Sequence, residues 1–257
     1  MLKAFVFGLI AAGALIIGEL LAVLVDRKDT DERREQIIAR ANRTIMAFGA
    51  GVLLCTVAFE LMEDAYKKGG FDQTTLGFLT GAIVFLGLDL WLDHMGSGVE
   101  LLLGALLDGI PESAVIGIGL VAQKGLGVIM MIAVFISNFP EGFSGTRDML
   151  SREHGKTFTA KSALTLWGIV TIICALSTLV GYSLLGSATP SWISFMLAVA
   201  AGAILAMVSH TMIPEAFEGV WAYTRHKSGT RFLIGDKIEA IAVVLGFLLS
   251  FILSRIT

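Results

Sequence analysis

Two short stretches carry the residues whose types and spacing suit the binding of a cation. They are Asp108-Gly-Ile-Pro-Glu-Ser113 and Ser137-Asn-Phe-Pro-Glu-Gly142, and each lies near the middle of a long apolar segment. Each places a glutamate directly after a proline. A carboxylate at the depth of a bilayer is costly and usually marks the path of a solute or an ion.

The prolines add backbone oxygens to these carboxylates. A proline inside a helix frees the carbonyl four residues earlier, here at Leu107 and Ile136. Broken helices with nearby acids are how transporters build cation sites at the midplane. The alternative is two kinked helices whose acids bond to neighbouring groups. Repetition of the motif on consecutive segments favours the cation site.

The spacing brings oxygen donors onto shared helix faces. Residues three or four apart share a face, so Asp108 accompanies Glu112, while Ser137 and Asn138 accompany Glu141. Three carboxylates, an amide oxygen and a hydroxyl, with no cysteine or histidine, form an oxygen-rich cation site. Neither segment contains a lysine or an arginine to neutralise the acids. If some of them are instead protonated, a proton relay is the competing interpretation.

The composition indicates that these motifs lie in a membrane. The chain is 55% hydrophobic and 16% charged, whereas soluble domains are about 25% charged. Cys55 and Cys174 both fall inside apolar runs, so we interpret them as small packing residues rather than as a disulfide.

We predict an all-α membrane protein with eight transmembrane helices, each near the ~20 residues that cross a bilayer. Fourteen of the nineteen basic residues lie at the connections after the first, third, fifth and seventh spans. These connections should therefore be cytoplasmic and both termini extracytoplasmic, in the inner membrane of the cell. The predicted spans are residues 4–25, 44–64, 74–94, 98–122, 126–146, 162–185, 191–214 and 237–255.

An internal repeat relates the second span to the seventh. Ala50-Gly-Val-Leu-Leu54 matches Ala201-Gly-Ala-Ile-Leu205, and Asp64-Ala65 matches Glu215-Ala216 in the same register. Chance similarity between small-residue helices could explain the first match alone. Because these spans run in opposite directions, we predict a 3+2+3 bundle within one domain, 1–257. Its inverted repeats are about 1–97 and 160–257, around a central helix pair at about 98–146.

Further polar residues stand at the ends of these two repeated spans. Glu60, Glu63 and Asp64 end the second span at the outer face, and His210 and Glu215 end the seventh at the inner face. We interpret them as entrance and exit groups of a cation path. The alternative is that they are merely solvated helix ends.

At these residues the chain resembles the ZIP family of divalent metal transporters. That family carries a His-Asn-x-Pro-Glu-Gly-like motif in its fourth span and a related one in its fifth, with eight spans, a 3+2+3 layout and both termini outside. Here the histidine and asparagine are Asp108 and Gly109, and the leading position of the fifth span, often histidine, is Ser137. Some relatives supply a carboxylate from the sixth span to a second metal, and this chain has none there. An all-oxygen site favours manganese or ferrous iron over zinc.

We therefore predict a transporter that moves divalent cations of the zinc, manganese or iron class into the cytoplasm without ATP. The chain contains no H-E-x-x-H, G-x-S-x-G or P-loop motif, so we predict no enzyme and no cofactor besides the metal as substrate. The expected partners are metal ions and the lipid bilayer, with no nucleic acid, and a homodimer is a possible assembly. Two alternatives are a proton-coupled carrier of another solute and a ZIP-like metal sensor or scaffold that has lost transport.

Overall fold

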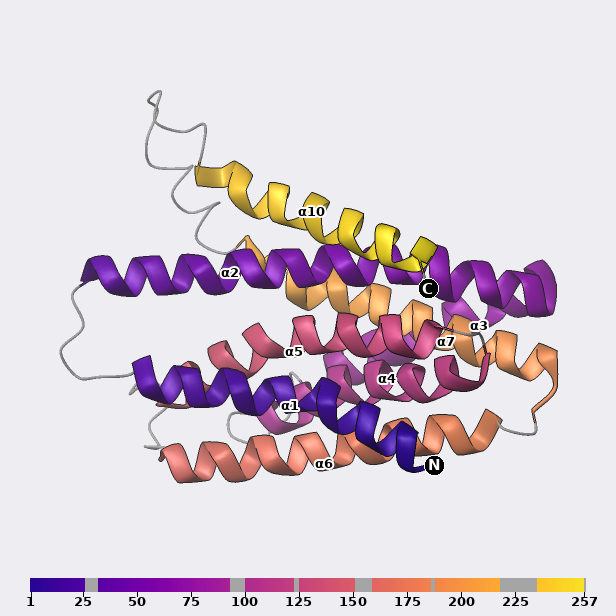
Figure 1. Ribbon diagram of the computed structural model, residues 1–257, viewed down its shortest axis with the longest axis horizontal. Helices are drawn as coiled ribbons and strands as arrows, with labels where there is room; N and C mark the ends of the chain where they lie inside the picture. Colours follow the sequence, from indigo (N-terminus) through magenta and orange to yellow (C-terminus); the bar gives the residue numbers. More distant parts are fainter. Residues whose placement is uncertain are drawn as a thin grey trace.

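The computed structural model describes residues 1–25, 32–92, 100–122, 125–150, 159–185, 188–217 and 235–256, and every regular element within them is helical. Seven helical stretches there are long and apolar enough to cross a membrane, which confirms an all-helical membrane protein (Figure 1). The elements are α1 (Leu2–Val25), α2 (Glu32–Cys55), α3 (Met62–Leu92), α4 (Glu100–Ala122), α5 (Leu126–Leu150), α6 (Ala160–Leu185), α7 (Pro190–Met207), α8 (Ile213–Ala216) and α10 (Gly235–Ile256), with π-helical segments η1 (Thr56–Leu61) and η3 (Val208–Met212).

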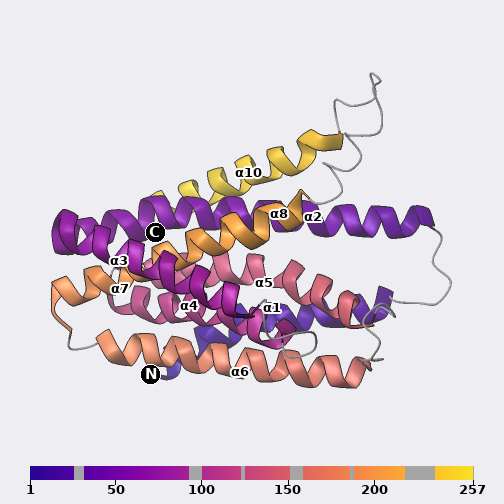
Figure 2. The same ribbon diagram turned by 180° about the vertical axis from the view of Figure 1, so that it is seen from behind.

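One of the seven stretches, Gln36–Leu92, is 57 residues long because α2, η1 and α3 follow one another without a loop. Within it, Gly70 has a φ of 71° and a ψ of −170°, which is not helical. Glycine reaches a positive φ readily, whereas a residue with a side chain does not. Figure 2 shows the ribbon turning back at this end of the molecule, so that α3 returns alongside α7. The predicted connection at 65–73 is therefore helical except at this reversal.

Glycines bring helices from the two halves of the chain together in matching ways. A Cβ on Gly51 of α2 would lie 2.0 Å from the carbonyl oxygen of Val243 in α10. A Cβ on Gly202 of α7 would lie 2.0 Å from the carbonyl oxygen of Phe78 in α3. Gly202 stands 151 positions after Gly51, the offset of the repeat seen in the sequence. The two halves thus use equivalent glycines for equivalent backbone contacts.

The reciprocal contacts follow the same register. Gly246 of α10 approaches the carbonyl of Phe48, and Gly81 of α3 approaches the carbonyl of Val199, again 151 positions after Phe48. The two π-helical segments also correspond, because η3 ends 151 positions after η1 ends. A sequence match of five residues therefore extends into shared packing and a shared departure from α-helical geometry.

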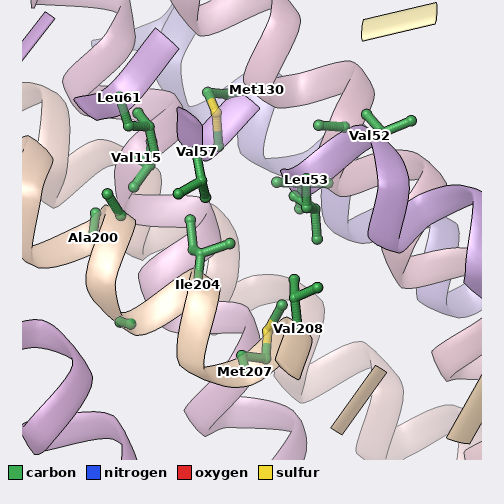
Figure 3. Packing of buried hydrophobic residues seen from close by; sticks show 14 of the residues in the cluster. Val52, Leu53, Val57, Leu61, Val115, Met130, Ala200, Ile204, Met207 and Val208 are labelled. Carbon is green, nitrogen blue, oxygen red and sulfur yellow. The ribbon is translucent and has the colours of Figure 1, made fainter. Parts of the chain in front are cut away.

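The buried apolar core lies between the π-helical segments and the central helices α4 and α5. Val57 of η1 and Ile204 of α7 are buried together with Val115 of α4 and Met130 of α5 (Figure 3). Each has an exposed fraction of 4% or less. The core therefore joins α2 and α7, with their π-helical ends, to the helices that carry the two Pro-Glu motifs.

Candidate cation site

Helices α4 and α5 form an antiparallel hairpin that holds both motifs. Gly125 stands just before α5 with a φ of 93°, and a Cβ on Gly119 would lie 2.9 Å from the backbone nitrogen of Gly127. Both helices continue through their prolines, Pro111 and Pro140. The motifs therefore face each other from neighbouring helices.

The first contact between the motifs joins Ser137 to Glu112. The Ser137 hydroxyl donates to Oε2 of Glu112 at 3.3 Å, and both side chains are buried. The same hydroxyl lies 3.1 Å from the carbonyl oxygen of Val134, so it donates to only one of the two at a time. Because the helices are antiparallel and four residues make about one turn, Asp108 lies level with Glu141. Glu112 of the first motif therefore faces Ser137 of the second, and Asp108 of the first faces Glu141 of the second.

The electrostatic surroundings of these side chains are acidic. Glu141 interacts with Asp108, Glu112 and Glu215, and Asp108 also interacts with Asp89 of α3. Among the described residues, the charged groups that act on the three motif carboxylates are all acids. Like charges in a buried setting repel strongly, so this group requires protons or a cation.

Two of the predicted ligands carry a buried acceptor that makes no hydrogen bond within the described part of the chain. They are Oε1 of Glu112 and Oδ1 of Asn138. The Asn138 amide donates from Nδ2 to the carbonyl of Ala11 at 3.2 Å, which fixes Oδ1 as the acceptor side. An unsatisfied buried acceptor costs about 1–3 kcal/mol. Both oxygens are therefore suited to a ligand that accepts electron pairs.

Helix α2 lies against the second motif. A Cβ on Gly49 would lie 3.3 Å from the Cα of Ser137 and 3.6 Å from the carbonyl oxygen of Ile136. Ile136 is the residue whose carbonyl Pro140 leaves without its usual helical partner. The close approach at Gly49 brings the scaffold helix to the point where the backbone of α5 is interrupted.

The carboxylates alone do not form a ready cage. Among the described residues, no three His, Cys, Asp or Glu side chains converge closely enough to hold a metal ion. A cation at this level would also need the neutral oxygens of Ser137 and Asn138. Ligation by the five predicted residues stays a prediction.

The predicted entrance residues lie in η1 and the start of α3, and each has a partner. Lys67 bonds Glu63 and Lys68 bonds Asp64, each at 2.5 Å. Glu60 is buried and is held by the end of α10. Asp64 is 6% exposed and its Oδ2 makes no hydrogen bond in the described residues.

The predicted exit residues connect to the motifs through an acid outside the predicted site. Nδ1 of His210 lies 3.1 Å from Oδ2 of Asp89, and Asp89 acts on Asp108. Glu215 of α8 acts on both Asp108 and Glu141. The structure therefore brings the exit group and the central acids into one electrostatic cluster.

Sequence reasoning missed a thiol beside the first motif. Cys55 and Cys174 are free and buried, which confirms the interpretation that they form no disulfide. Sγ of Cys174 lies close to the first motif, because a Cβ on Gly109 would lie 2.7 Å from it. No short motif contains Cys174. The one sequence feature that could have indicated a neighbour there is Gly109, which stands where the resembled family has asparagine.

Multiple apolar helices define a multi-pass membrane protein, and two of these helices carry the paired Pro-Glu motifs and their acids. No protein-family model matches the chain. Over 184 residues it is 26% identical to an Arabidopsis thaliana protein named "Putative zinc transporter". The match covers 66% of this chain and 29% of the relative, so the chain spans less than a third of that protein's length. The similarity supports the resemblance to the ZIP family, at a divergent level.

Proposed function

We propose that this protein moves divalent metal cations of the zinc, manganese or iron class into the cytoplasm through the hairpin of α4 and α5. The observation that carries the proposal is the buried contact between Ser137 and Glu112, beside an acceptor of Glu112 that lacks a partner in the described residues. The proposed ligands are Asp108, Glu112, Ser137, Asn138 and Glu141. Movement follows the gradient of the metal and needs no ATP.

The proposed topology has eight crossings in a 3+2+3 arrangement. A straight helix of 57 residues would be ~85 Å long at ~1.5 Å per residue, nearly three times the ~30 Å core of a bilayer. The reversal at Gly70 supports two crossings within this stretch. The matching contacts of Gly51 and Gly202 support inverted repeats at about 1–97 and 160–257 around the pair at about 98–146.

The proposed orientation places both termini outside the cytoplasm, in an inner membrane. It rests on the fourteen basic residues at the connections after the odd-numbered spans, seven of which lie outside the described residues. Tags at either end of the chain, tested for accessibility in intact cells, measure it. Labelling of either terminus only after permeabilisation would contradict the eight-crossing topology.

The proposed path runs from the end of η1 to the start of α8. The acids near the central site support its inner half, because Asp89 and Glu215 act on Asp108, and Glu215 also acts on Glu141. At the outer end, ion pairs with lysines would have to open for a metal to bind. The residues of the path are Glu60, Glu63, Asp64, His210 and Glu215.

The same cluster of acids favours one second candidate. Without a cation, repulsion among Asp108, Glu112 and Glu141 is relieved by protons, as a proton-coupled carrier of another solute would require. A metal sensor would instead bind cations and carry no flux.

Uptake by purified protein in liposomes, across a panel of Mn²⁺, Fe²⁺ and Zn²⁺, tests the proposal. We expect uptake that needs no ATP and no imposed pH gradient. The matched control is Asp72→Asn, which removes an exposed acid of α3 away from the motifs. Metal binding without uptake would support the sensor, and proton flux without metal binding would support the carrier.

A further inference from the structure

The outer half of α10 packs along the π-helical segment η1 through polar and aromatic side chains. The buried hydroxyls of Ser250 and Thr56 share a hydrogen bond of 3.0 Å. The rings of Phe247 and Phe251 meet the ring of Phe59 edge to face, with 6.0 Å and 5.5 Å between centroids. More than one turn of α10 therefore contacts η1, the segment that leads to the outer acids.

Arg255 adds a charge to the end of this contact. Its Cζ lies 5.1 Å from the centroid of the Phe251 ring, and its charge acts on both Glu60 and Glu63. Glu60 is buried, whereas Arg255 is exposed. The lysines of the outer group belong to the same helix as the acids they pair with. Arg255 comes from another helix, so its attraction to these acids draws α10 and η1 together.

The other half of the chain contains an equivalent contact. By their close backbone approaches, Gly81 of α3 corresponds to Gly246 of α10, 165 positions later. In that register Asp89 corresponds to Ser254, which acts on the buried acid of η1. Asp89 in turn lies 3.1 Å from His210 of η3. Because α2 and α7 run in opposite directions (Figure 1), the two contacts follow the inverted repeat.

We propose that the last turns of α10 form the outer gate of the cation path, and that Arg255 is the positioning residue that holds this gate closed. The inference rests on the proposed function. While the gate is closed, the guanidinium compensates Glu60 and Glu63. A passing divalent cation takes over this compensation and repels the arginine, so α10 and η1 separate. Arginine suits this position because it keeps its charge and stacks on aromatic rings.

The two cysteines of the chain can report this motion. Cys55 is the last residue of α2, is fully buried, and lies near enough to Ser250 of α10 to interact with it. Cys174 is fully buried in α6. A buried thiol reacts with a reagent only when its surroundings open. Separation of α10 from η1 should therefore expose Cys55 and leave Cys174 protected.

The test measures labelling of purified protein by N-ethylmaleimide, with peptide mass spectrometry to separate the two cysteines. Arg255→Gln should label Cys55 about fivefold faster than wild type, the order of effect expected for one partly exposed ion pair. Arg255→Lys keeps the charge without the stacking and should lie between the two. The matched control, Lys237→Gln, removes an exposed charge at the start of the same helix and should label like wild type. Mn²⁺ should accelerate labelling of Cys55 in wild type but not in Arg255→Gln.

Each outcome decides the inference. Labelling of Cys55 at the wild-type rate in Arg255→Gln would overturn it. Fast labelling of both cysteines would show that the variant has unfolded, and the wild-type response to Mn²⁺ then decides, because no acceleration there would overturn the gate. Uptake of Mn²⁺ with Cys55 labelling unchanged by Arg255→Gln would refute the gate alone, whereas faster labelling in a protein without uptake would refute transport alone.

Discussion

Two groups of buried acids in this protein are compensated in opposite ways. At the start of α3, Asp64 is 6% exposed and bonded to Lys68 one helical turn away. In the central hairpin, Glu112 is 2% exposed, and the charged groups that interact with it within the described residues are two other acids, Asp108 and Glu141. Where the fold supplies its own cation, the carboxylate is already neutralised. Where it does not, the carboxylate is left for a proton or for cargo.

The largest predicted effect is on metal uptake. It should distinguish an acid of the central hairpin from an acid of the outer group, Glu63 and Asp64, which are paired with lysines. We expect Glu112→Gln to lower metal uptake by ~100-fold, at the upper end of what loss of a supporting residue costs a metal site. The matched change Glu63→Gln removes an acid that is paired and 42% exposed, and should lower uptake less than ~3-fold. Initial rates of uptake in liposomes measure both variants. Equal losses of uptake in the two variants would contradict the difference between the central and the outer acids.

A smaller effect is expected from changing the chemistry of one central acid. Asp108→His replaces an oxygen donor with an imidazole nitrogen and removes a negative charge, so the ratio of zinc to manganese uptake should rise about tenfold, or ~1.4 kcal/mol. The ratio is measured with both metals in one assay. The control is Asp72→Asn, which should leave the ratio unchanged. An unchanged ratio in Asp108→His would show that this residue does not contact the cargo.

The smallest effect concerns the lysines of the outer group. Lys68→Met leaves the buried carboxylate of Asp64 without its ion pair, so we expect the free energy of unfolding to fall by ~1–3 kcal/mol. Millimolar divalent cation should restore part of this loss, because the metal replaces the missing ammonium. Lys67→Met breaks a pair whose side chains are 65% and 42% exposed, and should cost less than ~1 kcal/mol. Equal destabilisation in the two variants, by chemical denaturation in detergent, would contradict this ranking.

Sequence reasoning reached the helical membrane fold and the residues of the hairpin because hydropathy and proline are local signals. Sequence reasoning could not predict which residues of α4 and α5 face each other across the hairpin. Aligning the motifs matches Glu112 with Glu141, since each follows a proline. Antiparallel packing instead brings Glu112 to Ser137, which is 25 positions later in the chain. The equivalent residue of the second motif, Glu141, is 29 positions later. Pairing depends on where the hairpin turns, which neither motif encodes.

Two other features also needed three-dimensional structure. The chain continues as helix through the predicted connection at 65–73 and reverses at a single glycine, Gly70, which does not stand out among 29 glycines. Cys174 approaches Gly109 from a helix 65 positions later in the chain. Its neighbours in sequence are apolar, so composition indicates packing, whereas its neighbours in space are the unsatisfied polar groups of the first motif.

Equilibrium binding of Mn²⁺ to purified protein tests most directly whether the uncompensated acids of the hairpin hold the cargo. Wild-type protein and Glu63→Gln should bind the ion with similar affinity. Glu112→Gln and Glu141→Gln should each lose binding over the same concentration range while keeping their helical content by circular dichroism. Wild-type affinity in both hairpin variants, or loss of binding in Glu63→Gln alone, would place the cation elsewhere and contradict the account.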